Sequence, residues 1–258
     1  MFSETKFSPF PALYHAHHSQ HLEDLPFWLA LADSLSKSYR FPILELGCGT
    51  GRILLSLAQA GHTVFGLDND RAMLRFLSER LAPGDRALIH LIQADMTQFH
   101  LAARFELIIL PCNTLSTLSQ PALTELFACI SRHLSPGGAF VASLPNPQLL
   151  LHLPKKSGPE FEETFPHPLD GEPVQVSSAW QRDGQTFTVS WYYDHWLPDG
   201  RIEHLQTLIK HQIEPVQFYL HWLKDVGVDS IQLFGDFDRR PYRRTSTDLI
   251  IVARKPLP

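Results

Sequence analysis

Hydrophobic and polar positions divide the chain into an α/β region, a region of alternating residues and a return to the α/β pattern. Short apolar runs, typical of parallel strands covered on both faces, lie at 43–46, 64–67, 87–93, 105–110 and 139–144. Amphipathic segments before and between these runs predict helices over 24–36, 51–60, 70–81 and 121–133. Strands that alternate with helices predict an α/β sheet with helices on both faces.

A glycine-rich loop separates the first two apolar runs. Gly47, Gly49 and Gly51 follow the first run at alternate positions, and glycine permits positive φ and lets a ligand approach the backbone closely. Thr50 is predicted to cap the following helix. The second run ends at Asp68, whose two carboxylate oxygens can accept from both hydroxyls of a ribose. The unit therefore predicts a site for an adenosine-type ligand.

The spacing of the glycines distinguishes between two such ligands. A dinucleotide fingerprint places its third glycine one position later, where this chain has Arg52. The stretch ELGCGTG, followed by GLDND, resembles motifs I and II of the class I S-adenosylmethionine-dependent methyltransferases. The resemblance implies a Rossmann-like, seven-stranded mixed sheet, S-adenosyl-L-methionine as cofactor and S-adenosyl-L-homocysteine as product.

The resemblance also implies which residues bind the cofactor. In the family, the glycine loop contacts the methionine part and the acid after the second strand, here Asp68, binds the ribose. Asp95 would meet the adenine amino group and Met96 would pack on the ring, whereas a helix-capping role is the alternative for Asp95. The predicted cofactor-binding residues are Glu45, Gly47, Cys48, Gly49, Gly51, Asp68, Asn69, Met73, Asp95, Met96, Pro111 and Cys112.

The segment after the fourth apolar run reads PCNT, and the family places the reacting methyl group near this point. Methyltransferases that act on exocyclic amines carry an acidic or Asn, Pro, Pro, aromatic tetrad here. The departure argues against a nucleobase amine as acceptor. Asn113 is predicted as a catalytic and substrate-contacting residue. The SPGG sequence at 135–138, another recurrent family feature, predicts a turn before the fifth strand.

The N-terminal segment at 14–21 reads YHAHHSQH. His17 and His21 have the i, i+4 spacing of two helical metal ligands, but no third Cys, Asp or Glu stands at a recognisable spacing, so no metal site is predicted. Small-molecule methyltransferases often place an aromatic residue from this segment over cofactor and substrate. By that resemblance Tyr14 is predicted to contact substrate and act in catalysis, with His18 as a candidate for proton transfer. A helix-packing role for Tyr14 is the alternative.

Three Asp-Gly pairs, at 170, 183 and 199, are hairpin signals in the middle of the chain. They predict four antiparallel strands, near 160–167, 173–181, 186–196 and 201–211. Similar inserts occur in glycine N-methyltransferase-like enzymes and amino-sugar N-methyltransferases, where they cover the active site or make a dimer. The third strand places Phe187, Val189, Trp191 and Tyr193 on one face. Trp191 and Tyr193 are predicted to contact substrate, with a small hydrophobic core as the alternative.

The C-terminal part returns to the α/β pattern, with a helix over 214–226 and a closing antiparallel hairpin of strands at 230–234 and 248–253. Between these strands lies an arginine-rich loop with Arg239, Arg240, Arg243 and Arg244. Guanidinium groups bind carboxylate or phosphate well. The alternative is a solvated loop that Asp236 and Asp238 partly neutralise.

Composition narrows the function classes. The formal net charge of −5 argues against a nucleic-acid duplex as the main partner. Three cysteines without CxxC spacing fit a reducing cytoplasm, and no apolar run approaches the roughly 18 residues of a membrane span. We expect an N-terminal arm and helical cap at 1–39, a cofactor-binding core at 40–150 and 212–258, and an antiparallel insertion at 151–211 that acts as a lid or dimerisation element.

The resemblance predicts an enzyme of the EC 2.1.1 class that moves a methyl group to nitrogen or oxygen of a small molecule by in-line displacement. A sulfonium is an activated donor, so the protein mainly aligns donor and acceptor, excludes water and handles one proton. Three alternatives remain. The chain could be a non-catalytic S-adenosylmethionine-binding protein, a nucleic-acid or protein methyltransferase that uses the loop at 239–244, or, as the weakest rival, a dinucleotide oxidoreductase.

Overall fold

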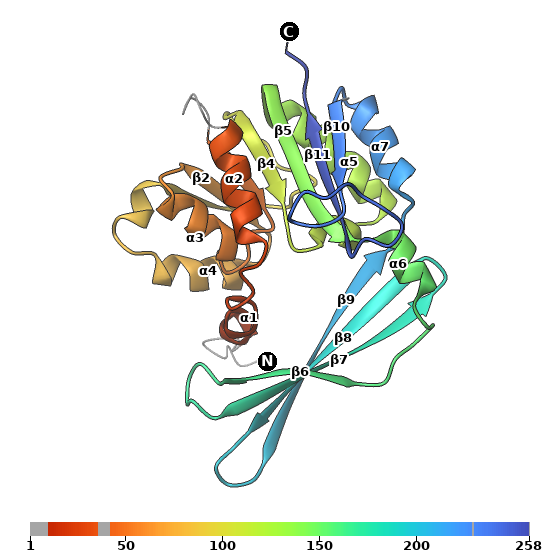
Figure 1. Cartoon of the computed structure of the whole chain (residues 1–258). Helices are drawn as coiled ribbons and strands as arrows, with labels where there is room; N and C mark the ends of the chain where they lie inside the picture. Colours follow the sequence, from red (N-terminus) through yellow and green to blue (C-terminus); the bar gives the residue numbers. More distant parts are fainter. Residues whose placement is uncertain (1–9, 36–41, 229, 258) are drawn as a thin grey trace, which may run out of the picture.

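The computed structural model describes residues 10–35, 42–228 and 230–257, which form two sheets and the helices around them (Figure 1). The N-terminal arm, predicted to be irregular over residues 1–11, lies mostly outside these residues, and its last two residues begin the first helix. The helices are α1 (Phe10–His18), α2 (Leu25–Leu35), α3 (Arg52–Gln59), α4 (Arg71–Arg80), α5 (Gln120–His133), α6 (Pro147–His152) and α7 (Val216–Asp225). Short 3-10 turns are η1 (Asp85–Ala87) and η2 (Thr114–Thr117).

The larger sheet has seven strands in the order β10-β11-β5-β4-β1-β2-β3. Its strands are β1 (Ile43–Leu46), β2 (Val64–Asp68), β3 (Ile89–Gln93), β4 (Phe105–Leu110), β5 (Leu134–Pro145), β10 (Ser230–Phe234) and β11 (Asp248–Arg254). The first five pair in parallel, whereas β11 pairs antiparallel with both β5 and β10. The predicted seven-stranded mixed sheet is confirmed.

Helices cover both faces of this sheet because alternate residues of each strand point to opposite sides. On one face, Leu44 and Leu46 share a buried cluster with residues of α5 and α7. On the other face, Ile43 belongs to a cluster with residues of α2, α3 and α4. Parallel strands buried in this way end at the same edge of the sheet, and the loops after β1, β2, β3 and β4 meet there.

The smaller sheet is the predicted antiparallel insertion, with the order β6-β7-β8-β9. Its strands are β6 (Glu160–Pro166), β7 (Pro173–Asp183), β8 (Thr186–Trp196) and β9 (Ile202–Gln212). Helix α6 leads into it, and α1 lies between this sheet and the α/β core (Figure 1). Leu13 of α1 packs in a buried cluster with Phe165 and Val174 of the insertion. The N-terminal cap is therefore held by the inserted sheet as well as by the core.

The predicted helix cap at Thr50 is wrong. The residue before α3 is Gly51, which has a left-handed backbone with φ 87° and provides no side-chain cap. A Cβ on Gly51 would lie 2.5 Å from Leu77 Cδ1, so the close approach of α4 requires glycine here. The Thr50 hydroxyl instead lies 3.2 Å from Nδ1 of His15 in the cap.

The predicted turn at 135–138 is also wrong, because β5 already begins at Leu134 and runs through it. The pairing of β5 with β4 shifts register between Phe105 and Leu107, and Gly137 has φ 75°. The glycines thus form an irregularity inside a strand rather than a connection before it. Smaller differences concern β3, which begins at Ile89, and α7, in which Pro215 is the N-cap.

No helix within the described residues is long and apolar enough to cross a membrane.

Candidate active site

A cavity of about 510 Å³ joins the glycine loop of the core to the inserted sheet. Its lining includes residues of α1, β1, the loop after β1, α3, the loop after β4, η2, α6, β8 and β9. Nine of the residues predicted to act in catalysis or to bind cofactor or substrate line it: Tyr14, His18, Glu45, Gly47, Cys48, Gly49, Cys112, Asn113 and Trp191. Segments up to 177 residues apart in the chain therefore meet at one cavity.

The glycine loop forms the core side of the cavity. Gly47 and Gly49 have φ values of 68° and 53°. A Cβ on Gly47 would lie 3.5 Å from Met96 Cε, and one on Gly49 would lie 3.9 Å from Cε1 of Tyr14. The loop thus has Met96 on one side and the Tyr14 ring on the other, a narrow cradle that bare backbone leaves open to a ligand.

Asp68 lies at the end of β2 and orders this loop. The Gly49 N–H donates to its Oδ2 at 2.8 Å, and the Asp70 N–H donates to its Oδ1 at 2.8 Å. A carboxylate offers about four acceptor positions, so each oxygen keeps a lone pair for a further donor such as a ribose hydroxyl. Asp68 therefore combines a structural role with room for the predicted one.

Glu45 is a buried carboxyl group in the middle of β1, beside the glycine loop. Its Oε2 finds no hydrogen-bond partner in the part of the chain that the structure describes. Burial raises the pKa of Glu45 to about 8; Arg52 opposes the shift, and the carboxylates of Asp24 and Asp68 add to it. A cation bound in the cavity would satisfy the orphaned oxygen and favour its ionised form.

The remaining predicted cofactor residues lie around the same edge of the sheet without lining the cavity. Asn69 and Asp95 are exposed after the neighbouring strands β2 and β3, while Met73 and Pro111 are buried. Asp95 Oδ1 accepts from the backbone N–H and hydroxyl of Thr97, which lowers the pKa of Asp95. No helix begins there, so the capping alternative for Asp95 is wrong. Its ligand role stays a prediction.

Arg52, which the glycine spacing singled out only to exclude a dinucleotide, connects three parts of the site. Its Nη2 donates to Oδ2 of Asp24 at 2.8 Å and to Sγ of Cys112 at 3.3 Å. Its Nη1 donates to the other oxygen of the Asp24 carboxylate and, at 2.6 Å, to the backbone carbonyl of His21. These partners lie 28 to 60 residues away in the chain. No local pattern could therefore have indicated the role.

The turn after β4 has a strained backbone. Cys112 and Asn113 follow one another with φ values of 57° and 61°, and this left-handed conformation is uncommon for residues other than glycine. Such outliers cluster at functional sites, where the surrounding structure holds them in place. Asn113 borders the cavity here, and its catalytic role stays a prediction.

The far side of the cavity is largely apolar. Phe187, Val189 and Trp191 of β8 line it, together with Leu150 and Ile209. Three of the four residues predicted to share a face of β8 are thus brought to the cavity. The fourth, Tyr193, is not, because α1 covers this end of the strand. Its hydroxyl instead lies 3.0 Å from Nδ1 of His17, and its predicted substrate contact stays a prediction.

His211 is a cavity residue that the sequence did not single out. It pairs with Phe187 across β8 and β9, so knowledge of the strand pairing would have found it. The hydroxyl of Ser116 donates to the carbonyl of Asn113 at 2.7 Å and lies 2.9 Å from Nδ1 of His211. The Ser116 hydroxyl has one proton, which it donates to Asn113, so it can only accept from His211. Nδ1 of His211 therefore carries the ring proton, and Nε2 is the acceptor nitrogen. Burial lowers the pKa of His211 and keeps it neutral.

Two further titratable groups from α1 enter the cavity. The Tyr14 and His18 rings lie 4.3 Å apart. Burial raises the pKa of Tyr14, so its hydroxyl keeps the proton. Burial, together with His17, His21 and Arg52, lowers the pKa of His18 to about 3. His18 is therefore a weak proton acceptor, which argues against its predicted role in proton transfer.

The arginine-rich loop lies beside a separate cavity of about 400 Å³, which shares no lining residue with the first. Arg240 pairs with Asp236 at 3.5 Å and with Asp238 at 3.3 Å, and the guanidinium of Arg239 lies 5.5 Å from the centre of the Phe27 ring. Two of the four arginines thus have partners within the chain. This geometry favours the solvated-loop alternative over an anion site at the reaction centre.

Comparisons with known proteins relate the chain to methyltransferases. Residues 43–138 match the family model described as a methyltransferase domain. A protein of Geobacillus sp. (strain WCH70), whose name assigns it to the methyltransferases, is 23% identical over 220 residues, which cover 83% of this chain and 84% of the relative.

Two solved structures share the fold over most of the chain. The CcbJ methyltransferase from Streptomyces caelestis superposes with a TM-score of 0.77 at 22% identity and covers 90% of this chain and 95% of its own. CalS10 from Micromonospora echinaspora, an amino pentose methyltransferase solved with SAM bound, gives a TM-score of 0.69 at 20% identity, with 99% and 100% covered. At these identities the likeness shows the fold.

Proposed function

We propose that this chain, which is a class I S-adenosylmethionine-dependent methyltransferase, moves the methyl group to the nitrogen of a small amine held beneath the β insertion. The observation that carries the proposal is the shared cavity. Its core side is a glycine cradle with an orphaned carboxylate oxygen, and its far side is an apolar and aromatic wall with a neutral histidine.

The residues present fit the cofactor. The orphaned Oε2 of Glu45 stands where the ammonium of a bound methionine part would satisfy it, and Gly47 and Gly49 leave the backbone open. Asp68 retains acceptor positions for the ribose. When bound, S-adenosylmethionine supplies an electrophilic methyl group on a sulfonium. These groups support binding of the donor at the glycine loop, in the cavity that the loop after β4 also lines.

The remaining residues would position the acceptor and remove one proton. The wall of Phe187, Val189 and Trp191 excludes water and confines a small molecule against the strained turn at Asn113. Nε2 of His211, held as an acceptor by the hydrogen bond at Nδ1, would take the proton that the amine loses. His211 replaces His18 as the proposed base, since the pKa of His18 is too low for the task.

A nitrogen acceptor is favoured over oxygen for a chemical reason. A neutral amine attacks a sulfonium carbon without prior deprotonation, whereas a hydroxyl needs a strong base. The titratable groups on the acceptor side of the cavity, three imidazoles (His18, His21 and His211) and the phenol of Tyr14, include no strong base. The name of the similar amino pentose methyltransferase describes an enzyme that acts on an amino sugar. Both points support an amine of that size.

Methyl transfer from isotope-labelled S-adenosylmethionine tests the proposal. The full chain is incubated with paired small molecules that differ only in an amino or a hydroxyl group, and the products are identified by mass spectrometry. We expect labelled N-methyl products from the amines. Turnover confined to the hydroxyl partners would overturn the nitrogen acceptor, and tight cofactor binding without turnover on a metabolite pool would favour the non-catalytic alternative.

The polymer-methylating alternative predicts salt-sensitive binding of nucleic acid or protein that falls when the four arginines at 239–244 are replaced. The partners of Arg239 and Arg240 and the separate cavity beside this loop count against it. A homodimer formed through the insertion stays a prediction, which the molecular mass in solution would test.

A further inference from the structure

We propose that His17, His18, His21 and Glu163 form a binding site for one divalent transition-metal ion of the zinc type, which joins the N-terminal cap to the inserted sheet. The site goes beyond methyl transfer and does not depend on the identity of the acceptor. It lies where α1 and the turn after it face β6.

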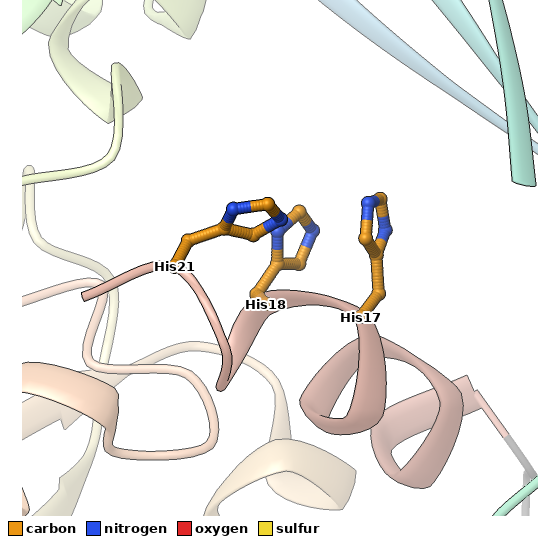
Figure 2. A group of neighbouring side chains, drawn as sticks. All are labelled: His17, His18 and His21. Atoms are coloured by element: carbon orange, nitrogen blue, oxygen red, sulfur yellow. The ribbon is translucent and has the colours of Figure 1, made fainter. Parts of the chain in front are cut away.

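The three histidines converge in space. Their rings project to the same side of the cap segment (Figure 2), and one ring nitrogen of each lies within 4.8 Å of those of the other two. The His17 and His18 rings are stacked 4.2 Å apart, and the centres of the His17 and His21 rings lie 5.8 Å apart. Three imidazole nitrogens gathered in this way are the donor set that Zn²⁺ prefers.

Glu163 supplies a fourth donor from a different element. Its Oε1 lies 3.2 Å from Nε2 of His17 and 3.5 Å from Nε2 of His21. Donors about 2.0–2.1 Å from a tetrahedral zinc ion lie about 3.3 Å from each other, so both distances match neighbouring ligands of one ion. Oε1 is also buried, and it receives no well-formed hydrogen bond from any residue that the structure describes.

A hydrogen bond behind His17 orients its ring. Nδ1 of His17 lies 3.0 Å from the hydroxyl of Tyr193, a partner of the kind that fixes the tautomer of a metal-binding histidine. In the tautomer whose Nδ1–H is donated to Tyr193, the lone pair of Nε2 would be free to coordinate a cation that Oε1 of Glu163, 3.2 Å away, also binds.

The ion would have a route from solvent and a place in the architecture. The side chain of His21 is 52% exposed, whereas that of His17 is 3% exposed. The cluster is therefore accessible to solvent at His21 and buried at His17. Since His18 and His21 also line the cavity, an ion there would fix the cap as one wall of the acceptor site. It would link α1 to β6, two elements otherwise joined mainly through the packing of Leu13.

A second cluster gives the experiment an internal control. His167, Asp170 and His195 also bring three donor atoms within 4.8 Å of one another, but they lie within the inserted sheet and away from the cap. In this cluster Asp170 accepts hydrogen bonds from both histidines, so its carboxylate is already satisfied. The first cluster is therefore the stronger candidate, and variants of the second should leave metal binding intact.

The test measures bound metal on the full-length, untagged protein. The chain is freed of metal with a chelator, exchanged into equimolar zinc and analysed by elemental mass spectrometry, and Co²⁺ is added to a parallel sample to record the visible absorption of a tetrahedral site. We expect one ion per chain in the wild type, in His195→Ala and in His221→Ala, a control at an exposed histidine of α7 that belongs to neither cluster. His21→Ala and Glu163→Gln should weaken binding at least 100-fold, and Tyr193→Phe about 10-fold.

Two results would overturn the proposal. The first is a wild-type chain that retains no zinc and gives no tetrahedral Co²⁺ spectrum. The second is loss of the ion in His195→Ala together with retention in His21→Ala and Glu163→Gln. Because Glu163→Gln nearly preserves the shape of the side chain, circular dichroism and the melting temperature without metal separate a lost ligand from a failure to fold.

Discussion

The two walls of the active-site cavity are built in different ways. The cofactor wall comes from one continuous stretch, 43–70, in which a strand, a glycine loop, a helix and a second strand place Gly47, Gly49 and Asp68 together. The acceptor wall collects Tyr14, Trp191 and His211 from three elements that only the tertiary fold brings together. The difference teaches that a local motif builds the proposed donor side, whereas long-range packing of cap and insertion builds the proposed acceptor side.

The largest effect is expected on the cofactor wall. Asp68→Ala removes the acceptor of two backbone N–H groups and the predicted acceptor of the ribose hydroxyls, and charge-assisted hydrogen bonds contribute about 1.5–3 kcal/mol each. We expect S-adenosylmethionine affinity to fall about 1000-fold, as measured by calorimetric titration, while Asp199→Ala, in an exposed hairpin, leaves it unchanged. An unchanged affinity in Asp68→Ala would remove the basis for calling this the cofactor wall.

On the acceptor wall, His211→Ala should lower kcat about 100-fold and leave cofactor affinity unchanged, because the base acts on the acceptor only. Steady-state kinetics with a saturating amine would show this, and Ser116→Ala, which loses the partner of Nδ1 and the hydrogen bond to the Asn113 carbonyl but keeps the imidazole, should have a smaller effect. If His211→Ala weakened cofactor binding as strongly as Asp68→Ala, the two walls would not act separately.

Glu45→Gln tests the buried carboxyl group of the proposed cofactor wall through the pH dependence of the free energy of unfolding. Between pH 4.5 and about 8 the unfolded carboxyl is ionised while the folded one keeps its proton, so the free energy of unfolding of the wild type falls as pH rises through this window. Glutamine does not titrate. We expect the variant to be more stable than the wild type by about 1–2 kcal/mol at pH 8, and equal to it near pH 4, in denaturant titrations.

Trp191→Ala should raise the KM for the amine about 10-fold, because an aromatic side chain leaves the cavity wall. Cofactor affinity should stay constant. Trp196→Ala is the matched control, since this tryptophan lies on the same strand but is 45% exposed and outside the cavity. Equal effects of the two variants would contradict the assignment of β8 to the acceptor wall.

The smallest effect concerns acid pH. The pKa of His211 lies below 6.5 in the folded chain, so the unfolded chain takes up the proton first and the free energy of unfolding falls as pH drops below 6.5. The same shift keeps Nε2 available as a base below pH 6.5. The kcat/KM of the wild type at pH 6.5 should therefore equal its value at pH 7. A decline of kcat/KM that already begins above pH 7 as the pH is lowered would refute the assignment of His211 as the base.

Much of the fold could be predicted because its strands and turns leave short, local patterns of apolar and turn-forming residues in the sequence. The apolar runs gave the strands of the core, and three Asp-Gly pairs divided the insertion into its four strands. Errors arose where a close approach outside the local pattern decided the geometry. Gly51 rather than Thr50 is the residue before α3, and Leu77 packs where a side chain at position 51 would lie.

The sequence by itself determined the geometry of the glycine loop and Asp68, the predicted donor side, since one βαβ unit fixes these residues by glycine conformation and strand direction. Only the tertiary structure decided the rest. Arg52 finds Asp24 and Cys112, His211 finds Ser116, and Glu163 joins His17 and His21, each across 28 to 146 residues. Contacts of this range leave no periodic trace in a chain, because they depend on how whole elements pack rather than on neighbouring residues.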